Sequence, residues 1–475
     1  MAFTYYPHDP AVNRKYDPVE ASYYLYQEYF IRQNHWNTHA GKAEHGHDFK
    51  GASPMRMSID LMFLIELYRQ LRARSDSRQS DLLNRLTVWL DFFYGGLKSV
   101  QNDSGSWYTA PFSGPSTGFV VNVMSQAYNH LPVDATRLAK YKEIADLGAQ
   151  AIATQETQYF YNGTGPYDGP EWYTKGLAVY DCGRYCADGS GYAKSPARRH
   201  NAIATNAGAL GRHAYHVARI NGYPDPANYP YRASLVRLAQ YIKNCQLSNG
   251  GWKTGSLSGA DEGSYWRCST ANNQQEFVIG ATCLAPVHYN MYDIIGLEWA
   301  GHGTTYTPQY QRPSSIFVDA AELGGNFYAT LVQRTNKFPV YTDGNNYGTH
   351  NIVDVNALYR AGQSDCWDFH TSDTEVPSWY LGVAFLGKNY QGLVDQCFKR
   401  EGFMEMAAHD HGAFDDPATV YVGKIDFRGD GTILKDWYVH SNRQTAKWGY
   451  QNEPCFHRVL LGLTGCMEKG LTIYG

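Results

Sequence analysis

The sequence predicts a mainly α-helical fold, an (α/α) toroid of roughly six or seven helical hairpins with a small β-hairpin near the C-terminus. Three observations support this expectation. Apolar residues recur with helical spacing in paired runs along the chain. A distinctive turn pattern follows two of those runs. No change in composition marks a domain boundary, so residues 1–475 are expected to form a single domain.

The expected elements follow from the apolar periodicity and from the helix-ending residues between the runs. Pro286 separates two of the helices, because proline interrupts the hydrogen bonding within a helix. Residues 419–438 surround Gly429-Asp430-Gly431 with strand-like sequence, which predicts the β-hairpin. In chain order, helices are expected at about 19–32, 55–74, 79–100, 117–131, 135–154, 200–220, 230–246, 272–284, 287–299, 314–334, 351–361, 376–388, 390–405 and 454–469, the last of which would close the ring.

The turn pattern is Gln-x3-Gly-x-Trp, and it occurs at Gln101–Trp107 and at Gln246–Trp252. In the second copy Asn249 and Gly250 favour a tight turn, because both tolerate positive φ. Each copy follows a helical run. The repetition therefore indicates a helix–turn–helix unit that stacks into a solenoid or a closed toroid.

Composition favours a carbohydrate-active protein. The chain contains 39 Tyr and 11 Trp, whose flat faces and polar groups suit sugar rings. A net charge of −4 gives no general basic field for nucleic acid. The sequence contains no apolar run of roughly 18 or more residues, so no membrane-spanning helix is expected. Because residues 1–10 lack the features of a signal peptide, we expect a secreted chain in its mature form or, alternatively, a cytoplasmic protein.

Polar and aromatic residues are densest in segments 265–276 and 286–293, the first of which contains Arg267. In the second, His288 and Tyr292 are four residues apart and would share one face of a helix, with Tyr289 on the next face. Such a group could transfer protons. It could equally consist of buried side chains that hydrogen-bond to the backbone.

A second candidate group lies where the helix expected at 200–220 begins. Asn201 could simply be an N-cap, a common position for asparagine. Alternatively, Asn201, His200 and Arg199 could bind an anionic substrate at the positive end of the helix. Small residues on this helix suit an inner, closely packed position in the fold: Ala202, Ala204, Ala207 and Ala209.

No organic cofactor is expected, because the sequence contains neither a dinucleotide-binding glycine motif nor a phosphate-binding lysine loop. The sequence at 114–118 has the spacing Gly-x-Ser-x-Gly, but it follows no expected strand, so we do not expect the strand–turn–helix nucleophile elbow of a serine hydrolase. A divalent metal such as Ca²⁺ or Zn²⁺ is an alternative, with His45 and His47 or His409 and His411 as candidate ligands.

The Gln-x3-Gly-x-Trp turns resemble those of squalene-cyclising terpene cyclases and of some pectate lyases. The acidic Asp-x-Asp-Asp and Asp-Asp-x-x-Asp motifs that a cyclase needs are not in this sequence. With the His/Asn and Tyr segments, the chain resembles the (α/α)-toroid polysaccharide lyases that act on alginate and glucuronan, and polysaccharide lyase family 38 in particular. The resemblance rests on about a tenth of the chain.

The resemblance implies β-elimination on a uronic-acid polysaccharide. Asn201 and His200 would neutralise the substrate carboxylate, which stabilises the charge that develops as the C5 proton leaves. Tyr292, or Tyr289 in its place, would serve as base and acid. Arg267 and His288 would lower the tyrosine pKa or bind substrate. The residues that could stack against sugars or bind the polymer are Trp107, Trp172, Trp252 and Arg199.

Two other functions are consistent with the same sequence. An inverting glycoside hydrolase of the toroid fold needs two carboxylates that flank the bond to be cleaved. The candidate acids for this reaction are Asp168 with Glu171, Asp261 with Glu262, and Asp415 with Asp416. A toroid that binds glycans without cleaving them is the other alternative. In each case the expected partner is an acidic polysaccharide, and the sequence does not indicate an oligomeric state.

Overall fold

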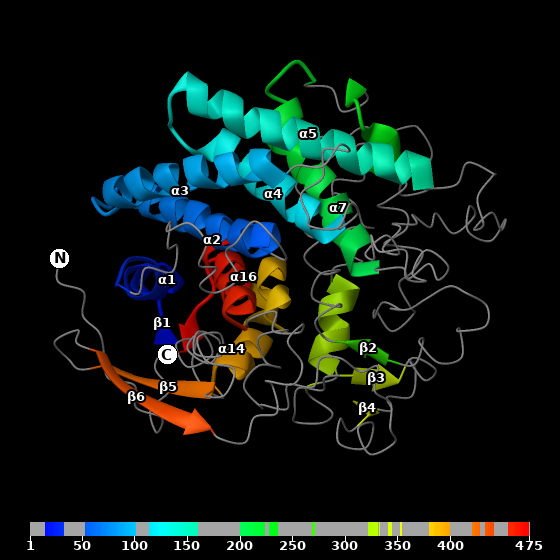
Figure 1. Ribbon diagram of the computed structural model, residues 1–475. Coiled ribbons are helices and arrows are strands. Elements are labelled where there is room, and N and C mark those ends of the chain that lie inside the picture. The colour runs from blue at the N-terminus through cyan, green and yellow to red at the C-terminus, as the bar shows by residue number, and fades with distance from the viewer. Residues whose placement is uncertain are drawn as a thin grey trace.

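The computed structural model is mostly helical in the part of the chain that it describes. The structure describes residues 15–32, 53–100, 114–159, 200–223, 228–235, 268–270, 322–330, 332, 341–343, 352–353, 380–399, 420–427, 433–440 and 455–474. Figure 1 shows the long helices packed side by side in the upper part of the molecule and the labelled strands below them.

Helix α1 (Pro18–Leu25) begins the described helical part of the chain, close to the start of the helix expected at 19–32. Asp17 caps it by accepting a hydrogen bond from the backbone N–H of Val19, at 2.8 Å. Pro18 suits the first turn because its missing N–H would have no partner there. The chain continues as the π-helical segment η1 (Tyr26–Arg32).

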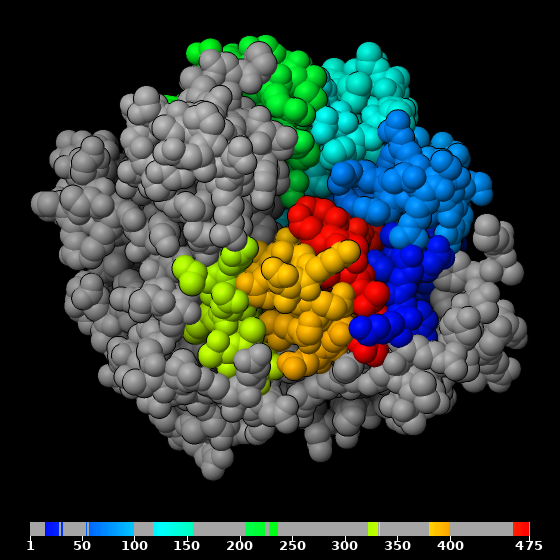
Figure 2. All heavy atoms as spheres, turned by 180° about the vertical axis from the view of Figure 1, so that it is seen from behind, coloured from blue at the N-terminus to red at the C-terminus, as the bar shows by residue number. Residues whose placement is uncertain are grey.

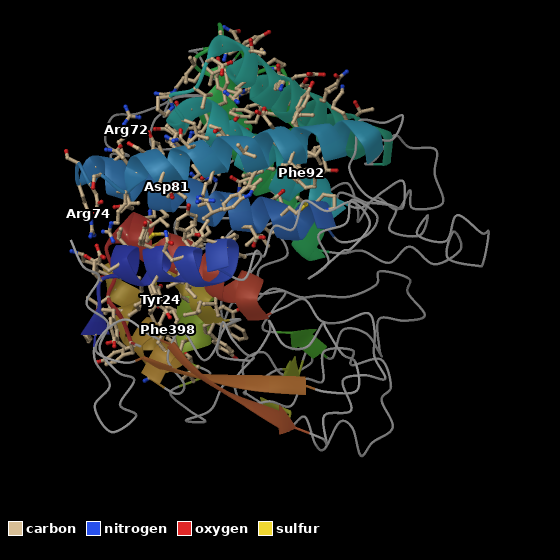
Figure 3. The ribbon with its side chains drawn as sticks, turned by 60° about the vertical axis from the view of Figure 1, so that its left-hand side comes forward. Tyr24, Arg72, Arg74, Asp81, Phe92 and Phe398 are labelled. Carbon is tan, nitrogen blue, oxygen red and sulfur yellow. The ribbon has the colours of Figure 1, made fainter. Side chains whose placement is uncertain are left out.

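Helices α2 (Ser53–Ala73) and α3 (Gln79–Val100) form the first long hairpin. The short turn between them is fixed to α1 by ion pairs: Arg74 binds Asp17, and Arg78 binds Glu20. Figure 3 shows Arg72, Arg74 and Asp81 around this turn. Helix α3 ends at Val100, directly before the first Gln-x3-Gly-x-Trp sequence, so the helix end predicted there is confirmed.

Helices α4 (Gly114–His130) and α5 (Ala135–Tyr159) form the second hairpin, and α5 is five residues longer than expected. Helix α7 (His200–His213) follows and continues as the π-helical segment η5 (Ala214–Ala218). The expected helix at 200–220 is therefore confirmed. Its inner position is also supported, because Ala207 and Ala209 are fully buried.

The packing alternates between two layers of helices. Helices α16 (Cys455–Lys469), α2, α4 and α7 pack against one another in that order. Helix α3 follows α2 in the sequence and packs on it, and α5, which comes between α4 and α7 in the sequence, packs on both of them along the outside of the row. Because the last turns of the four row helices lie together, these helices run in the same direction.

The two ends of the described chain meet. Strand β1 (Lys15–Tyr16) pairs in antiparallel fashion with β7 (Ile473–Tyr474). Helix α16 packs on α1 and α2, and the space-filling view shows it between the N-terminal helices and residues 380–399 (Figure 2). The helix predicted at 454–469 is thus confirmed, and it joins the C-terminal part of the chain to the N-terminal part.

Residues 376–388 and 390–405 were expected to be two helices, and the structure divides the chain near the expected place. Segment η8 (Leu381–Leu386) is a 3-10 helix, and α14 (Gln391–Lys399) follows after the short 3-10 segment η9 (Lys388–Tyr390). Gly387 lies between η8 and η9 with a φ of 93°, which glycine adopts far more readily than other residues.

Two glycines on α16 allow it to lie very close to η8. A Cβ built at Gly465 would lie 2.9 Å from the backbone nitrogen of Phe385, and one at Gly462 would lie 2.6 Å from the Cβ of Leu381. We therefore expect Gly465→Val to force the two segments apart and to lower the free energy of unfolding by about 2–3 kcal/mol, measured by urea denaturation.

Gly95→Ala is the matched control for this substitution. Gly95 is an exposed residue in α3, and a Cβ there would meet no atom within 4 Å. Alanine should therefore raise the free energy of unfolding by about 0.5–1 kcal/mol, because it restricts the unfolded chain. Wild-type stability in the Gly465→Val protein would show that α16 and η8 are not in close contact.

The C-terminal β-hairpin is confirmed. Strands β5 (Val420–Phe427) and β6 (Ile433–His440) are antiparallel, and Phe427 pairs with Ile433. The helix predicted at 351–361 is wrong at its start, because Ile352–Val353 form strand β4. Strand β4 pairs with β3 (Tyr341–Asp343), which pairs with β2 (Cys268–Thr270), and this small sheet was not predicted.

Nearly all the buried apolar side chains that the structure describes form one cluster, which extends from Val19 to Tyr474. Figure 3 shows two of its aromatic members, Tyr24 of α1 and Phe398 of α14. A helical segment at 322–330, within the helix expected at 314–334, adds Tyr328 to this cluster. Among the described residues, no helix is sufficiently long and apolar to span a membrane.

Candidate functional site

Two of the predicted site residues, His200 and Asn201, are the first two residues of α7. The backbone N–H groups of a first helical turn have no partner within the helix, and the helix dipole places partial positive charge there. This end of α7 could therefore receive an anionic group.

The other predicted site residues lie outside the described part of the chain. They are Arg199, Arg267, His288, Tyr289, Tyr292, Trp107, Trp172 and Trp252, the histidines at positions 45, 47, 409 and 411, and the three acid pairs at 168 and 171, 261 and 262, and 415 and 416. The described residues contain no group of His, Cys, Asp and Glu side chains that could hold a metal ion.

Helices α4 and α7 meet along a polar seam. At one end, Gly118 of α4 lies against Asn206 of α7, and at the other end Asn129 approaches His216 of η5 at 2.9 Å. Gly118, Asn122, Gln126 and Asn129 recur with helical spacing, so they share one face of α4. Asn122 and Gln126 are buried and hydrogen-bonded to each other at 2.7 Å.

Asn206 is the exceptional member of this seam. Its side chain is fully buried, and neither its carbonyl oxygen nor its amide nitrogen has a hydrogen-bond partner in the structure as described. A buried polar group without a partner typically costs about 1–3 kcal/mol, so proteins rarely leave one without a reason. A Cβ at position 118 would come within 2.6 Å of the Asn206 oxygen, so any larger residue there would displace the Asn206 side chain.

Charged and titratable side chains fill the opposite end of the row, where the last turns of the helices lie together. Arg212 approaches His216 at 3.4 Å and Glu468 of α16 at 3.8 Å. Glu66 of α2 is buried and bound by Arg69 at 2.5 Å. These arginines place positive charge near the negative ends of the helices, which stabilises the arrangement.

His130, the last residue of α4, and His216 are both held neutral. Burial, followed by the charge of Arg69, lowers the pKa of His130 to about 3. Burial and then the charge of Arg212 lower the pKa of His216 well below its usual value. The two rings are in edge contact, with centroids 5.0 Å apart, so a proton on one ring would make protonation of the other less favourable.

The carboxylates of the same region respond in opposite ways. Burial raises the pKa of Glu66, although Arg69 opposes this effect. Burial also disfavours ionisation of Glu468, but Arg212 and Lys469 outweigh it and lower the Glu468 pKa. The region is therefore a network of compensating charges, and its buried, mutually bound groups are suited to joining α2, α7 and α16.

A separate chain of hydrogen bonds joins the second hairpin to α7. His213 contacts Asp146 of α5 through Nε2 and the Tyr229 hydroxyl through Nδ1, each at 2.9 Å. Burial lowers the pKa of His213 despite the attraction of Asp146. Because His213 and Tyr229 are buried, this Asp–His–Tyr arrangement positions helices rather than exposing a reactive group.

Sequence reasoning did not identify Asn206, Arg212, His216 or Glu468. Arg212 and His216 are four residues apart on a helix expected to be inner, and polar residues on such a helix were an available signal. Glu468 carried no local signal, because its partner Arg212 is remote in the sequence.

Comparison of the chain with known protein families, with curated proteins and with solved structures gives no match.

Proposed function

We propose that the protein is a polysaccharide lyase that cleaves a uronic-acid polymer, such as alginate or glucuronan, by β-elimination. The observation that carries the proposal is the position of His200 and Asn201 at the start of α7, which packs in parallel on α4. The positive ends of both helices therefore lie on the same side of the helix row, where an anionic sugar could bind.

The proposed architecture is the (α/α) toroid. The row α16–α2–α4–α7 and the linking helices α3 and α5 have the alternation of inner and outer helices that such a ring needs. The β1–β7 pairing and the packing of α16 on α1 and α2 join the two ends of the chain, as ring closure requires.

The proposed reaction begins at the substrate carboxylate. Asn201 and His200 neutralise it, so that the charge left when the C5 proton departs can spread onto the carboxyl group. Tyr292, with Tyr289 as the alternative, takes this proton and then supplies one to the leaving oxygen. The C4–O bond breaks as a C4=C5 double bond forms, and water does not enter the product.

Arg267 and His288 complete the proposed site. Positive charge near the tyrosine lowers its pKa and thus favours the phenolate that acts as base. The proposal needs no metal, and the substrate partner is an acidic polysaccharide. The protein is proposed to act outside the cell, where such polymers are accessible.

The test is incubation of the purified protein with alginate, glucuronan and pectate. We expect one of these to yield products with the ultraviolet absorbance of an unsaturated uronate, also in the presence of a chelator. The matched control is the same polymer with its carboxyl groups reduced to alcohols, which should not be cleaved because it lacks the group that stabilises the developing charge.

The other outcomes identify the alternatives. Reducing ends without the ultraviolet absorbance would show a glycoside hydrolase that uses paired carboxylates. Binding of polymer without any product would show a glycan-binding protein. Loss of cleavage on chelation would show a metal-dependent site and would contradict the metal-free form of the proposal.

A further inference from the structure

We propose that the Asn206 side chain is part of a carboxylate-binding subsite at the N-terminal end of the α4–α7 seam. The inference deepens the proposed function and rests on it for the identity of the ligand, a uronate. It adds a residue that the sequence did not indicate.

The first step is the state of the side chain itself. Asn206 is fully buried, and both polar atoms of its carboxamide lack a hydrogen-bond partner in the structure as described. Asn122 and Gln126, two other carboxamides of the same seam, bind each other at 2.7 Å. Asn206 thus retains two donors and an acceptor that a ligand could use.

The second step is the direction of the side chain. Side chains on a helix point toward its N-terminus. The Asn206 oxygen accordingly lies beside Gly118, one turn from the start of α4 at Gly114. The carboxamide is therefore directed to the end of the helix pair where the α7 dipole is positive and where α7 begins with His200 and Asn201.

The third step is the space around the carboxamide. Glycine at position 118 leaves room for the Asn206 carboxamide, since a Cβ there would come within 2.6 Å of its oxygen. Position 202, one turn earlier on the same face of α7, is alanine. With glycine at 118 and alanine in the sequence at 202, a carboxylate that enters between the first turns of α4 and α7 could accept a hydrogen bond from the Asn206 Nδ2 group.

The experiment measures binding of sodium D-glucuronate to the full chain by calorimetry, with D-glucose as the neutral control. Asn206→Ala should weaken glucuronate binding by roughly ten- to a hundred-fold, because a hydrogen bond to a charged group is lost. Asn206→Asp, which has nearly the same shape but a negative charge, should weaken it further. Glucose binding should not change.

Asn129→Ala is the matched control, because it removes a carboxamide from the far end of the same face of α4. It should lower the melting temperature and leave glucuronate binding unchanged. Asn206→Ala should leave the melting temperature unchanged or raise it, since it removes a buried group that has no partner. A structural role for Asn206 predicts the opposite pattern, a lower melting temperature with normal binding, and would overturn the inference.

The results also separate this inference from the proposed function. If the Asn206→Ala protein forms unsaturated products with the KM of the wild type, the proposed lyase function stands and the subsite inference fails. If glucuronate binding depends on Asn206 but no polymer is cleaved, the subsite inference stands and the proposed lyase function fails.

Discussion

Acidification from pH 7 to pH 5 should destabilise this protein strongly, because three histidines are held neutral in the folded state. The pKa values of His130, His213 and His216 are all lowered, and burial is the main cause in each case. In the unfolded chain a histidine takes up a proton below about pH 6.5. Their contribution to stability is therefore present above that pH and is lost as the pH falls toward the folded values.

The size of the effect follows from proton linkage. A histidine that is neutral when folded and has an ordinary pKa when unfolded loses about 2 kcal/mol of stabilisation between pH 7 and pH 5. His130 and His216 together give about 4 kcal/mol, a large part of the stability of a typical domain, and the lowered pKa of His213 adds to this loss. The raised pKa of Glu66 opposes this trend. The lowered pKa values of Asp146 and Glu468 add to the loss at more acidic pH.

The measurement is urea denaturation at pH 7 and pH 5 of the wild type and of His130→Gln. The variant lacks one titrating group, so its difference between the two pH values should be smaller by about 2 kcal/mol. Val120→Ala, a fully buried position in α4, should lower stability equally at both pH values. An unchanged pH difference in His130→Gln would show that this histidine is not held neutral.

The helices could be predicted because their signals are local. The apolar spacing in α2 and α3 and the Gln-x3-Gly-x-Trp sequence that follows α3 are readable from neighbouring residues. The β5–β6 hairpin is also local, since its strands are adjacent in the sequence. Expected element ends differ from the structure by a few residues, as at α5.

The small sheet could not be predicted in the same way. Ile352 and Val353 lie between residues that allow a helix, and their strand conformation depends on pairing with Tyr341–Asp343. Strand β2 at Cys268–Thr270 is still more distant in sequence from its partner. Pairing between such segments depends on the tertiary fold, which overrides local propensity.

The residues of the candidate site likewise divide into those with a local sequence signal and those that depend on contacts remote in the sequence. His200 and Asn201 were predictable as a helix start, because a helix N-terminus has a local composition. The role we propose for Asn206 depends on Gly118, which is in another hairpin. The link between Arg212 and Glu468 joins α7 to the C-terminal helix. Neither contact leaves a pattern within a short stretch of sequence.

The second large effect concerns catalysis: Tyr292→Phe should abolish lyase activity. The phenol oxygen is the group that the proposed mechanism uses as base and acid, and phenylalanine removes only that atom. Positioned proton transfer typically contributes roughly a hundred- to ten-thousand-fold to rate, so kcat should fall by about that factor. KM should change little, because the ring and the carboxylate-binding residues remain. The initial rate of unsaturated uronate formation measures both constants.

Tyr289→Phe is the matched comparison, three residues earlier in the same segment. If Tyr292 is the base, Tyr289→Phe should retain most of the activity; if their roles are exchanged, the two results will be exchanged as well. Far-ultraviolet circular dichroism of both variants should match the wild type, since neither loses an apolar group. Full activity in both single variants would remove tyrosine from the mechanism. It would direct the search for a base to His200 and His288, which could take the C5 proton in its place.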